Sequence, residues 1–438
     1  MLSKEDNELL TRVGPGTPTG ELLRRYWQPA LLSSELPGPD SDPLRVRLLG
    51  EDLVAFRDTS GRPGLLGAHC PHRGASLFFG RNEECGLRCV YHGWKFDVAG
   101  QCVDMPSEPP ESNFKDKIHH TAYPCEERGG VIWAYMGPSR PAPPLPALEW
   151  IDLPPAQRYQ AKRLQYCNWV QALEGDIDQS HVSFVHRQLG GNGGARNPRV
   201  DRIRTADTHP RFAALDTEYG VLIGAQRAAG DGSDYWRLTQ FLLPYWSMTG
   251  PYGENPSRQT RAWVPMDDEN VMVFSVTFHP LRPLTEDEVA RMRAGSGAGY
   301  VGEANFLPPT SAPGGAWRPK ASQANDYFLD RARQRTAHFS GIPEFWAQDA
   351  AMQEGMGPIY DRRNEHLGTS DLGIITVRRR ILAEARSLAA GGADPPGVCD
   401  PAVYQVRGAA ALLPHDADWL ELTADLRRVV PGLNPAGV

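Results

Sequence analysis

The stretch between residues 68 and 96 constrains the fold of this chain more than any other. It contains two short loops that each supply one cysteine and one histidine: Cys70 with His72, and Cys89 with His92. Two thiolates and two imidazoles in paired loops are typical of an iron–sulfur cluster in which histidine replaces cysteine on one iron. Because imidazole is neutral, such a cluster carries less negative charge and accepts an electron more readily.

A structural zinc site is the alternative for the same four ligands. Zinc fingers usually group their ligands as Cys-x-x-Cys followed by His-x₃₋₅-His. Here each loop mixes the two residue types, and a single residue, Pro71, separates the cysteine from the histidine in the first loop. The pattern therefore favours the iron–sulfur cluster, and Gly74 and Gly93 suit the tight turns that would surround it.

Composition narrows the remaining classes of protein. The chain has 438 residues, of which 40% are hydrophobic and 23% charged, enough for two or three domains with buried cores. Its net charge of −7 offers no basic face for nucleic acid, and it has no apolar run of about 18 residues that would span a membrane. The start does not resemble a signal peptide, and the seven cysteines are scattered, so we expect a cytoplasmic protein.

Proline-rich seams divide the chain into three expected parts. Residues 1–37 should form helices that pack on a catalytic domain, residues 38–141 a mostly β domain around the two loops, and residues 142–438 the catalytic domain. In the last part, strand patterns between residues 212 and 279 and a long helix at residues 371–388 predict an antiparallel sheet covered by helices. The expected fold class is α+β.

Several other segments carry expectations. Helices are predicted at residues 324–336 and 343–355, a mobile loop or lid at residues 295–322, and an irregular tail from residue 391 to Trp419. The charges of residues 357–371 are expected to hold subunits together. Four histidines without ligand-like spacing are expected to be surface or satisfied polar residues: His209, His279, His338 and His366.

A predicted helix at residues 168–184, with the residues just after it, holds a second group of possible metal ligands. Asp178 and His181 are three apart and would share a helix face. His181 and His186 are five apart, a turn of about 140° on an ideal helix, so both face one ion only if the helix bends or frays before the glycines at residues 190–194. Spacing alone leaves open that both histidines are ordinary polar surface residues.

The cluster upstream favours metal binding, because a one-electron donor is useful only beside an acceptor. A non-haem Fe(II) centre held by two histidines and one carboxylate is the expected acceptor. Asp349 is the candidate third ligand, because a carboxylate in an apolar helical stripe is costly unless it is paired or bound to a cation. The stripe consists of Phe345, Met352 and Met356. A salt bridge from Asp349 to an arginine is the alternative.

With these residues, the sequence resembles the large subunit of Rieske non-haem iron oxygenases of the phthalate-dioxygenase-like group. Asp178, His181 and His186 fall on the family's Asp-x-x-His-x₄-His pattern, and Asp349 matches its carboxylate position. The resemblance runs from the first helix to near Trp419. It implies a [2Fe–2S] cluster bound in an all-β Rieske domain, and a mononuclear Fe(II) bound in a catalytic domain of the helix-grip type.

The resemblance also implies partners and a reaction. A separate NAD(P)H-dependent flavin and iron–sulfur reductase would reduce the cluster, and the iron would activate O₂ beside a small aromatic substrate. Asp178 would be a catalytic residue that links the iron ligand His181 of one subunit to the cluster ligand His92 of the next. The implied assembly is a head-to-tail homotrimer or a multiple of it.

The substrate is less constrained, because ring cis-dihydroxylation and O- or N-dealkylation both occur on this scaffold. The family bias is toward aromatic acids, and a carboxylate would suit the planar fork of an arginine. Arg237 is the first candidate and Arg227 the second, although both could face solvent. An aryl-ether O-demethylase is the alternative enzyme. The alternatives of other classes are an electron carrier with the cluster alone and a zinc-stapled binding module.

Overall fold

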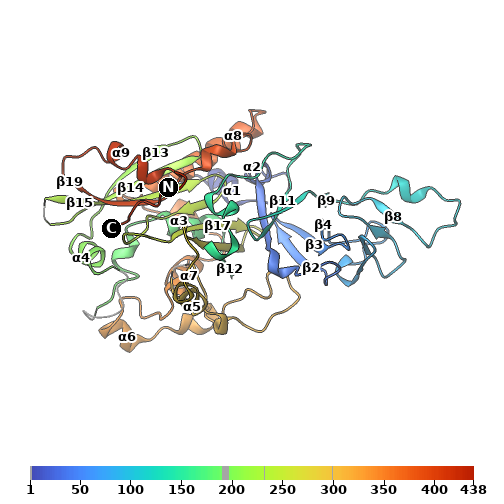
Figure 1. The fold of residues 1–438 in the computed structure, drawn as a ribbon, viewed down its shortest axis with the longest axis horizontal. Helices are drawn as coiled ribbons and strands as arrows, with labels where there is room; N and C mark the ends of the chain where they lie inside the picture. The colour runs from blue at the N-terminus through green and yellow to red at the C-terminus, as the bar shows by residue number, and fades with distance from the viewer. Residues whose placement is uncertain (1, 190–196, 231, 298) are drawn as a thin grey trace.

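The computed structural model describes residues 2–189, 197–230, 232–297 and 299–438. Figure 1 shows an elongated molecule in which a broad body carries both marked termini and a narrower lobe projects from one end. No helix among the described residues is long and apolar enough to cross a membrane. The α-helices of these residues are α1 (Lys4–Thr11), α2 (Pro18–Arg24), α3 (Trp169–Ile177), α4 (Pro198–Ala206), α5 (Glu286–Arg293), α6 (Arg331–Thr336), α7 (Phe345–Gly355), α8 (Leu372–Ala389) and α9 (Trp419–Leu422).

The projecting lobe is built from two antiparallel sheets of four strands each. The first has the order β2 (Leu44–Leu48), β3 (Glu51–Arg57), β4 (Pro63–Gly67) and β9 (Ala122–Tyr123). The second has the order β5 (Arg81–Glu83), β6 (Gly86–Arg88), β7 (Lys95–Phe96) and β8 (Cys102–Asp104). Their core contains the buried side chains of Phe56, Leu66, Trp94 and Phe96.

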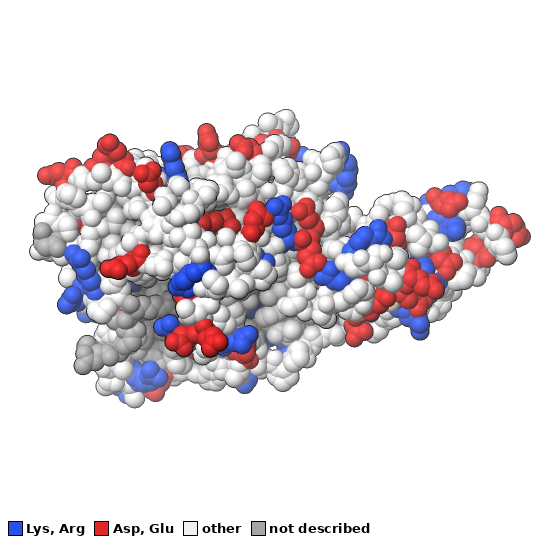
Figure 2. Space-filling model, viewed as in Figure 1, with Lys and Arg blue, Asp and Glu red and all other residues white. Residues whose placement is uncertain are grey.

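Charged side chains of both signs are interleaved over this lobe, as Figure 2 shows. Arg88 pairs with Glu83 at 2.8 Å and with Asp104 at 2.7 Å, and so ties β5, β6 and β8 together. Lys95 of β7 pairs with Glu84 at 3.1 Å. These ion pairs hold the short strands of the second sheet together.

One antiparallel sheet of eight strands forms the centre of the body. Its order is β12 (Arg158–Gln165), β18 (Val271–Phe278), β17 (Arg258–Pro265), β16 (Trp246–Met248), β15 (Ser233–Leu242), β14 (Gly220–Ala228) and β13 (Arg211–Asp216), with β19 (Ala409–Pro414) also paired to β15. Helix α3 packs against β15 to β17, while α8 packs against β13 and β14. The close contact of α8 needs Gly373, because a Cβ there would lie 3.0 Å from Ile223. The predicted α+β class, with an antiparallel sheet covered by helices, is confirmed.

A third sheet joins the body to the lobe. Its order is β1 (Trp27–Leu32), β11 (Val131–Tyr135) and β10 (Cys125–Arg128). The segment 1–37 was expected to be helical, but only α1 and α2 are α-helical and β1 is a strand. Both helices pack against α8, as expected of a segment that rests on the catalytic domain. The division at residues 37 and 141 stays a prediction.

Three local predictions were wrong. The predicted helix at residues 168–184 ends at Ile177, and the one at residues 324–336 is regular only in α6. Before α6 the backbone of Asp326 and Tyr327 is left-handed, with φ of 50° and 53°, and the Tyr327 hydroxyl donates to Glu354 at 2.5 Å. The tail is not irregular up to Trp419, since it contains β19. The glycines at residues 190–194 lie outside the described residues.

The C-terminal half of the loop at residues 295–322 is held in place by contacts with other parts of the chain. Trp317 donates its indole N–H to Glu35 at 2.8 Å, and Glu35 in turn forms a 2.6 Å ion pair with Lys162. Lys162 is buried, and burial lowers its pKa, although the charge of Glu35 counteracts that effect. The mobility expected of this loop stays a prediction.

The charges of residues 357–371 act at least partly within the chain. Arg362 is fully buried and pairs with Glu174 of α3 at 3.4 Å. Arg378 of α8 pairs with the same Glu174 and with Glu365, both at 2.5 Å. This buried network fixes α3 relative to α8, so Arg362 and Glu365 have a role inside the fold, while the role expected for this tract between subunits stays a prediction.

We expect the substitution Arg378→Met to destabilise the protein strongly. It would leave the carboxylates of Glu174 and Glu365 buried with less positive charge beside them, and removing one partner of a buried ion pair costs about 3–5 kcal/mol. The matched control is Arg379→Met at the next position of α8, where the pair with Asp216 is exposed and is worth about 0–1 kcal/mol. Thermal unfolding followed by circular dichroism measures both. Equal melting temperatures for the two variants would contradict this account.

Candidate metal centres

The two cysteine–histidine loops share one backbone pattern. In each, the cysteine N–H donates to the carbonyl five residues later, and a glycine four residues later donates back to the cysteine carbonyl. The pairs are Cys70–Ala75 (2.8 Å), Gly74–Cys70 (2.9 Å), Cys89–Trp94 (2.8 Å) and Gly93–Cys89 (2.9 Å). Both glycines have a positive backbone angle φ, +72° and +82°, which residues with a Cβ rarely adopt. The recurring Cys-x₃-Gly spacing was present in the sequence and would have predicted this symmetry.

The four side chains converge between these loops. The rings of His72 and His92 lie 4.4 Å apart, and His72 stacks on Trp94 at 4.5 Å. Burial raises the pKa of the Cys70 thiol to about 11, and the neighbouring Cys89 adds to the shift. The Nδ1 atom of His72 is buried without a hydrogen-bond partner among the described residues. Two thiols and an imidazole nitrogen that lacks a partner fit a metal cluster, which would stabilise the thiolates and bind the nitrogen.

One edge of this site reaches the surface. Val90 and Tyr91, which lie between the ligands of the second loop, are each 57% exposed. His92 follows them directly and is partly exposed. The second loop is therefore accessible to another protein that gives or takes an electron.

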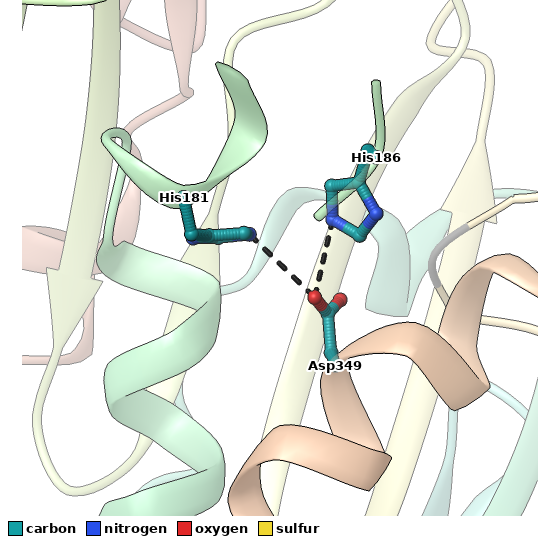
Figure 3. A group of neighbouring side chains, drawn as sticks. All are labelled: His181, His186 and Asp349. Atoms are coloured by element: carbon teal, nitrogen blue, oxygen red, sulfur yellow. Dashed lines mark ion pairs between the residues drawn. The ribbon is translucent and has the colours of Figure 1, made fainter. Parts of the chain in front are cut away.

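A second convergence lies in the body of the molecule, between α3 and α7 (Figure 3). Two imidazoles point at one carboxylate oxygen: His186 Nε2 lies 3.1 Å and His181 Nε2 3.6 Å from Oδ1 of Asp349. Ligand atoms of all three residues lie within 4.8 Å of one another. The structure thus brings together the three residues that the sequence indicated as a facial iron site.

Local sequence explains how the histidines reach this position. Helix α3 stops at Ile177 because Asp178 turns the chain: its φ and ψ are extended, and its carboxylate accepts the N–H of Ser180 at 2.6 Å. His181 therefore lies in a short 3₁₀ turn after the helix, and His186 lies beyond that turn. The turn of about 140° that an ideal helix would place between the two imidazoles does not apply, because neither residue is in α3.

Close packing of two helices brings Asp349 to the histidines. Gly175 of α3 faces Gln353 of α7, and a Cβ on Gly175 would lie only 1.9 Å from the Gln353 amide nitrogen. The apolar stripe that was expected to surround Asp349 is not buried, since Phe345, Met352 and Met356 are exposed. The side chain of Asp349 is nevertheless only 19% exposed. A carboxylate at that depth still requires a positive partner.

Hydrogen bonds and charges at the site suit a cation. Asp178 Oδ2 lies 3.1 Å from His181 Nδ1 and can only accept, so that nitrogen carries the proton. The other nitrogen of His181 then presents a lone pair toward Asp349, which is unfavourable unless a cation or proton lies between them. Burial raises the pKa of Asp349, but the two imidazoles when protonated, together with Arg163, outweigh burial and lower the pKa overall. Two imidazoles and a carboxylate with open space fit Fe(II).

Arginines gather beside this site. Arg227 of β14 is fully buried and donates to the Gln179 carbonyl at 2.5 Å, while Arg237 of β15 is 9% exposed and stacks on Tyr252. Arg227 also lies 3.5 Å from the Ser183 hydroxyl, in the same 3₁₀ turn as His181. Burial and the charge of Arg237 act to lower the pKa of His181, but the carboxylates of Asp178 and Asp349 outweigh them and raise it overall. Burial and the neighbouring charge of Arg204 lower the pKa of Arg227 to about 10. Neither predicted arginine faces solvent.

Sequence reasoning missed two residues of this region. Arg204 of α4 donates to the Tyr252 hydroxyl and completes the arginine group. Gln348 of α7 lies between His186 and His338, with Oε1 2.7 Å from His186 Nδ1. No spacing in the sequence signalled either residue, because each lies far along the chain from its partners. His338 is a satisfied polar residue, as expected, and it lies next to the site.

Comparisons with known proteins agree with both sites. A family model described as a Rieske [2Fe-2S] domain matches residues 26–123, and one described as LigXa C-terminal domain like matches residues 134–431. The 3-chlorobenzoate-3,4-dioxygenase oxygenase subunit of Comamonas testosteroni is 41% identical over 96% of this chain and 97% of its own length. The phthalate 4,5-dioxygenase oxygenase subunit of Pseudomonas putida is 36% identical over 100% of this chain and 98% of its own.

Another relative is named for a different reaction, and solved structures share the fold. The 5,5'-dehydrodivanillate O-demethylase oxygenase subunit of a Sphingobium strain is 36% identical over 92% of this chain and 85% of its own length. Dicamba monooxygenase bound to dicamba superposes with a TM-score of 0.57 at 18% identity, covering 84% of this chain and 99% of that one. The oxygenase in a reduced complex with ferredoxin in carbazole 1,9a-dioxygenase gives 0.54 at 18%, covering 89% and 98%.

A Rieske cluster domain joined to a catalytic domain of this kind defines the terminal oxygenase component of an aromatic ring-hydroxylating system. This chain belongs to that family, the Rieske oxygenases with a LigXa-like C-terminal domain, and the predicted family is confirmed. Its cofactors are a [2Fe–2S] cluster and a mononuclear iron. The electron carrier and the zinc-stapled module are thereby set aside.

We expect Gly93→Ala to reduce the amount of cluster that the protein holds. A Cβ there would lie 2.6 Å from Cγ of Pro106, and φ is +82°, so the second cysteine loop must shift. Gly61→Ala is the matched control, because its φ is +81° but nothing lies within 4 Å. Visible absorbance per chain measures the cluster. Equal losses in the two variants would show that backbone strain alone, and not the shape of the loop, is responsible.

Proposed function

We propose that this oxygenase component hydroxylates an aromatic carboxylate, by a phthalate-like cis-dihydroxylation. The arginine group beside the candidate iron site is the observation that carries the proposal. Nε and Nη1 of Arg227 and Nε of Arg237 are buried without a hydrogen-bond partner among the described residues. Buried cations that lack partners are costly, and a substrate carboxylate would supply the missing acceptors. The names of two relatives, for chlorobenzoate and for phthalate, support the same class of substrate.

In this proposal the chain's own residues set the geometry of the reaction. When bound, the cluster supplies electrons one at a time and the mononuclear iron activates O₂. His181, His186 and Asp349 would occupy one side of the iron and leave the opposite positions open. Arg237 and Arg227 would hold the substrate carboxylate, so that the aromatic ring is oriented toward that open side.

The proposed assembly is a head-to-tail homotrimer or a multiple of it. The two ligand groups lie in different parts of the molecule, one in the projecting lobe and one in the body (Figure 1). His92 lies beside exposed residues, and the Asp178 side chain is 20% exposed. A contact between His92 of one subunit and Asp178 of the next would be heterologous, and such contacts form a closed ring when the rotation between subunits is a whole fraction of a turn, as in a trimer.

The proposed electron source is a separate NAD(P)H-dependent flavin and iron–sulfur reductase. The partly exposed cluster loop offers such a partner a place to dock. None of the seven cysteines forms a disulfide in the structure, which supports a reducing compartment such as the cytoplasm.

O-demethylation of an aryl ether is the second candidate, because one relative that covers most of this chain is named for that reaction. Product analysis distinguishes the two. Benzoate-like and phthalate-like acids and methoxylated aromatics would be supplied with a surrogate reductase, NADH and O₂. The proposal expects coupled O₂ and NADH use with an aromatic acid and a cis-diol product. Formaldehyde release from a methoxylated substrate, without diol from any acid, would favour the demethylase.

We expect Arg237→Met to raise KM for an aromatic acid about 10- to 100-fold, since hydrogen bonds to charged groups contribute about 1.5–3 kcal/mol. An aromatic substrate without a carboxylate should be little affected. Arg211→Met, at an exposed position that begins β13, two strands away from β15 in the same sheet, is the control and should leave both values unchanged. Steady-state oxygen consumption measures all three proteins. An unchanged KM for the acid in the Arg237 variant would contradict the assigned role.

We expect Asp178→Asn to keep both metal centres but to slow electron transfer between them. The one oxygen of asparagine can still accept from His181 Nδ1 and so keep the His181 tautomer, at the expense of the bond to the Ser180 N–H, while the charge that would link His181 to a neighbouring subunit is lost. Replacing a carboxylate behind a metal-bound histidine typically reduces activity about 10- to 100-fold. Stopped-flow absorbance would follow reoxidation of the reduced cluster by O₂ and substrate. Reoxidation at the wild-type rate in a fully loaded variant would rule out this role.

A further inference from the structure

A buried chain of hydrogen bonds runs away from the candidate iron site on the side of His186. Gln348 Oε1 lies 2.7 Å from His186 Nδ1. The amide nitrogen of Gln348 lies 2.9 Å from the Ile342 carbonyl and 3.0 Å from His338 Nε2. His338 Nδ1 then lies 3.0 Å from the Ser340 hydroxyl. Gln348 and His338 are 2% and 5% exposed, so water does not compete for these contacts.

The backbone carbonyl of Ile342 determines the direction of the hydrogen bonds in this series. The Ile342 carbonyl can only accept, so the NH₂ end of Gln348 must face it. The second amide hydrogen then points to His338, whose Nε2 accepts it. The remaining end of Gln348 is its carbonyl, which can only accept from His186 Nδ1. His186 therefore carries its proton on Nδ1, and the lone pair of Nε2 is directed at Asp349, 3.1 Å away.

We propose that Gln348 is a positioning residue for the mononuclear metal, which holds His186 in the tautomer and orientation that a metal ligand needs. This inference rests on the ligand set proposed above and extends it. The opposite amide orientation would put NH₂ against His186 Nδ1, move the proton to Nε2 and block the ligand nitrogen. That orientation would also place the Gln348 carbonyl against the Ile342 carbonyl, which disfavours it.

One further contact makes this arrangement specific. The ring of His186 stacks on Phe345 with centroids 3.9 Å apart and planes 14° apart, so rotation of the ring is restricted as well. Phe345, Gln348 and Asp349 all belong to α7, so one helix supplies a metal ligand and both groups that orient another ligand. His181 is held differently, by the carboxylate of Asp178. The two histidines therefore differ in their support: one has a charged partner and the other a neutral amide.

The test compares Fe(II) affinity among variants that keep the cluster. The mononuclear iron is removed by chelation, Fe(II) is added back at increasing concentration, and iron in excess of acid-labile sulfide is counted. Gln348→Leu should weaken Fe(II) binding about 10- to 100-fold, as expected when the partner of a metal-bound histidine is lost. Gln348→Glu still accepts from His186 Nδ1, and a proton on its second oxygen can be donated to the Ile342 carbonyl, so it should restore binding to within a few-fold of wild type.

A matched control separates this role from simple loss of a buried amide. Gln240 of β15 is fully buried and bonds to Tyr219 and the Arg407 carbonyl, not to a candidate ligand. Gln240→Leu should keep wild-type Fe(II) affinity, even if its melting temperature without mononuclear iron falls as much as that of Gln348→Leu. Wild-type affinity in Gln348→Leu, or equally weak binding in Gln348→Leu and Gln348→Glu, would overturn the inference.

One more variant distinguishes failure of this inference from failure of the ligand set. His186→Ala should lose the mononuclear iron altogether while the cluster remains. If His186→Ala binds Fe(II) like wild type, the proposed ligand set is wrong, and the inference falls with it. If His186→Ala loses the iron but Gln348→Leu keeps it, the ligand set stands and only the role of Gln348 is rejected.

Discussion

The carboxylate of Asp349 needs a positive charge, and much of the catalytic domain is arranged around that need. Two imidazoles point at one of its oxygens from 3.1 and 3.6 Å. Asp178 fixes the proton of His181 on the far nitrogen, and Gln348 contacts the equivalent nitrogen of His186. With lone pairs directed at a carboxylate, the site is unfavourable when empty and favourable around a cation. The charges and hydrogen bonds of the site therefore favour a bound metal ion, whatever reaction the site performs.

The backbone meets this requirement by ending one helix early and packing another very closely. Helix α3 stops at Ile177, so that both histidines are presented from irregular chain after the helix. Gly175 then allows the side chain of Gln353, and with it α7, to approach α3. The buried network of Arg378 and Glu174 ties α3 to α8 and so to the central sheet. Residues without any role in chemistry thus fix the relative positions of the groups that have one.

Most of the predictions that could be made from the sequence depended on local motifs. The cluster loops, the α+β class and the family follow from short spacings and periodic patterns, because each depends on neighbours along the chain. Asp349 was predicted to be a metal ligand because its carboxylate would be buried and would need a positive partner, although the apolar side chains expected around it are exposed in the structure. Arg204 and Gln348 were missed because they reach their partners only through the folded chain. The same reason explains the missed strands β1 and β19, whose partners lie far along the sequence.

The most direct test of the account is a single turnover without any reductase. Protein whose cluster has been reduced chemically, and from which excess reductant has been removed, is mixed with O₂ and an aromatic acid that the steady-state screen accepts. We expect the cluster to be reoxidised as hydroxylated product forms, and chelation of the mononuclear iron to abolish product while the visible spectrum persists. Product formation that survives chelation, or a cluster that is reoxidised without any product, would contradict the transfer of electrons from the cluster to an iron held by His181, His186 and Asp349.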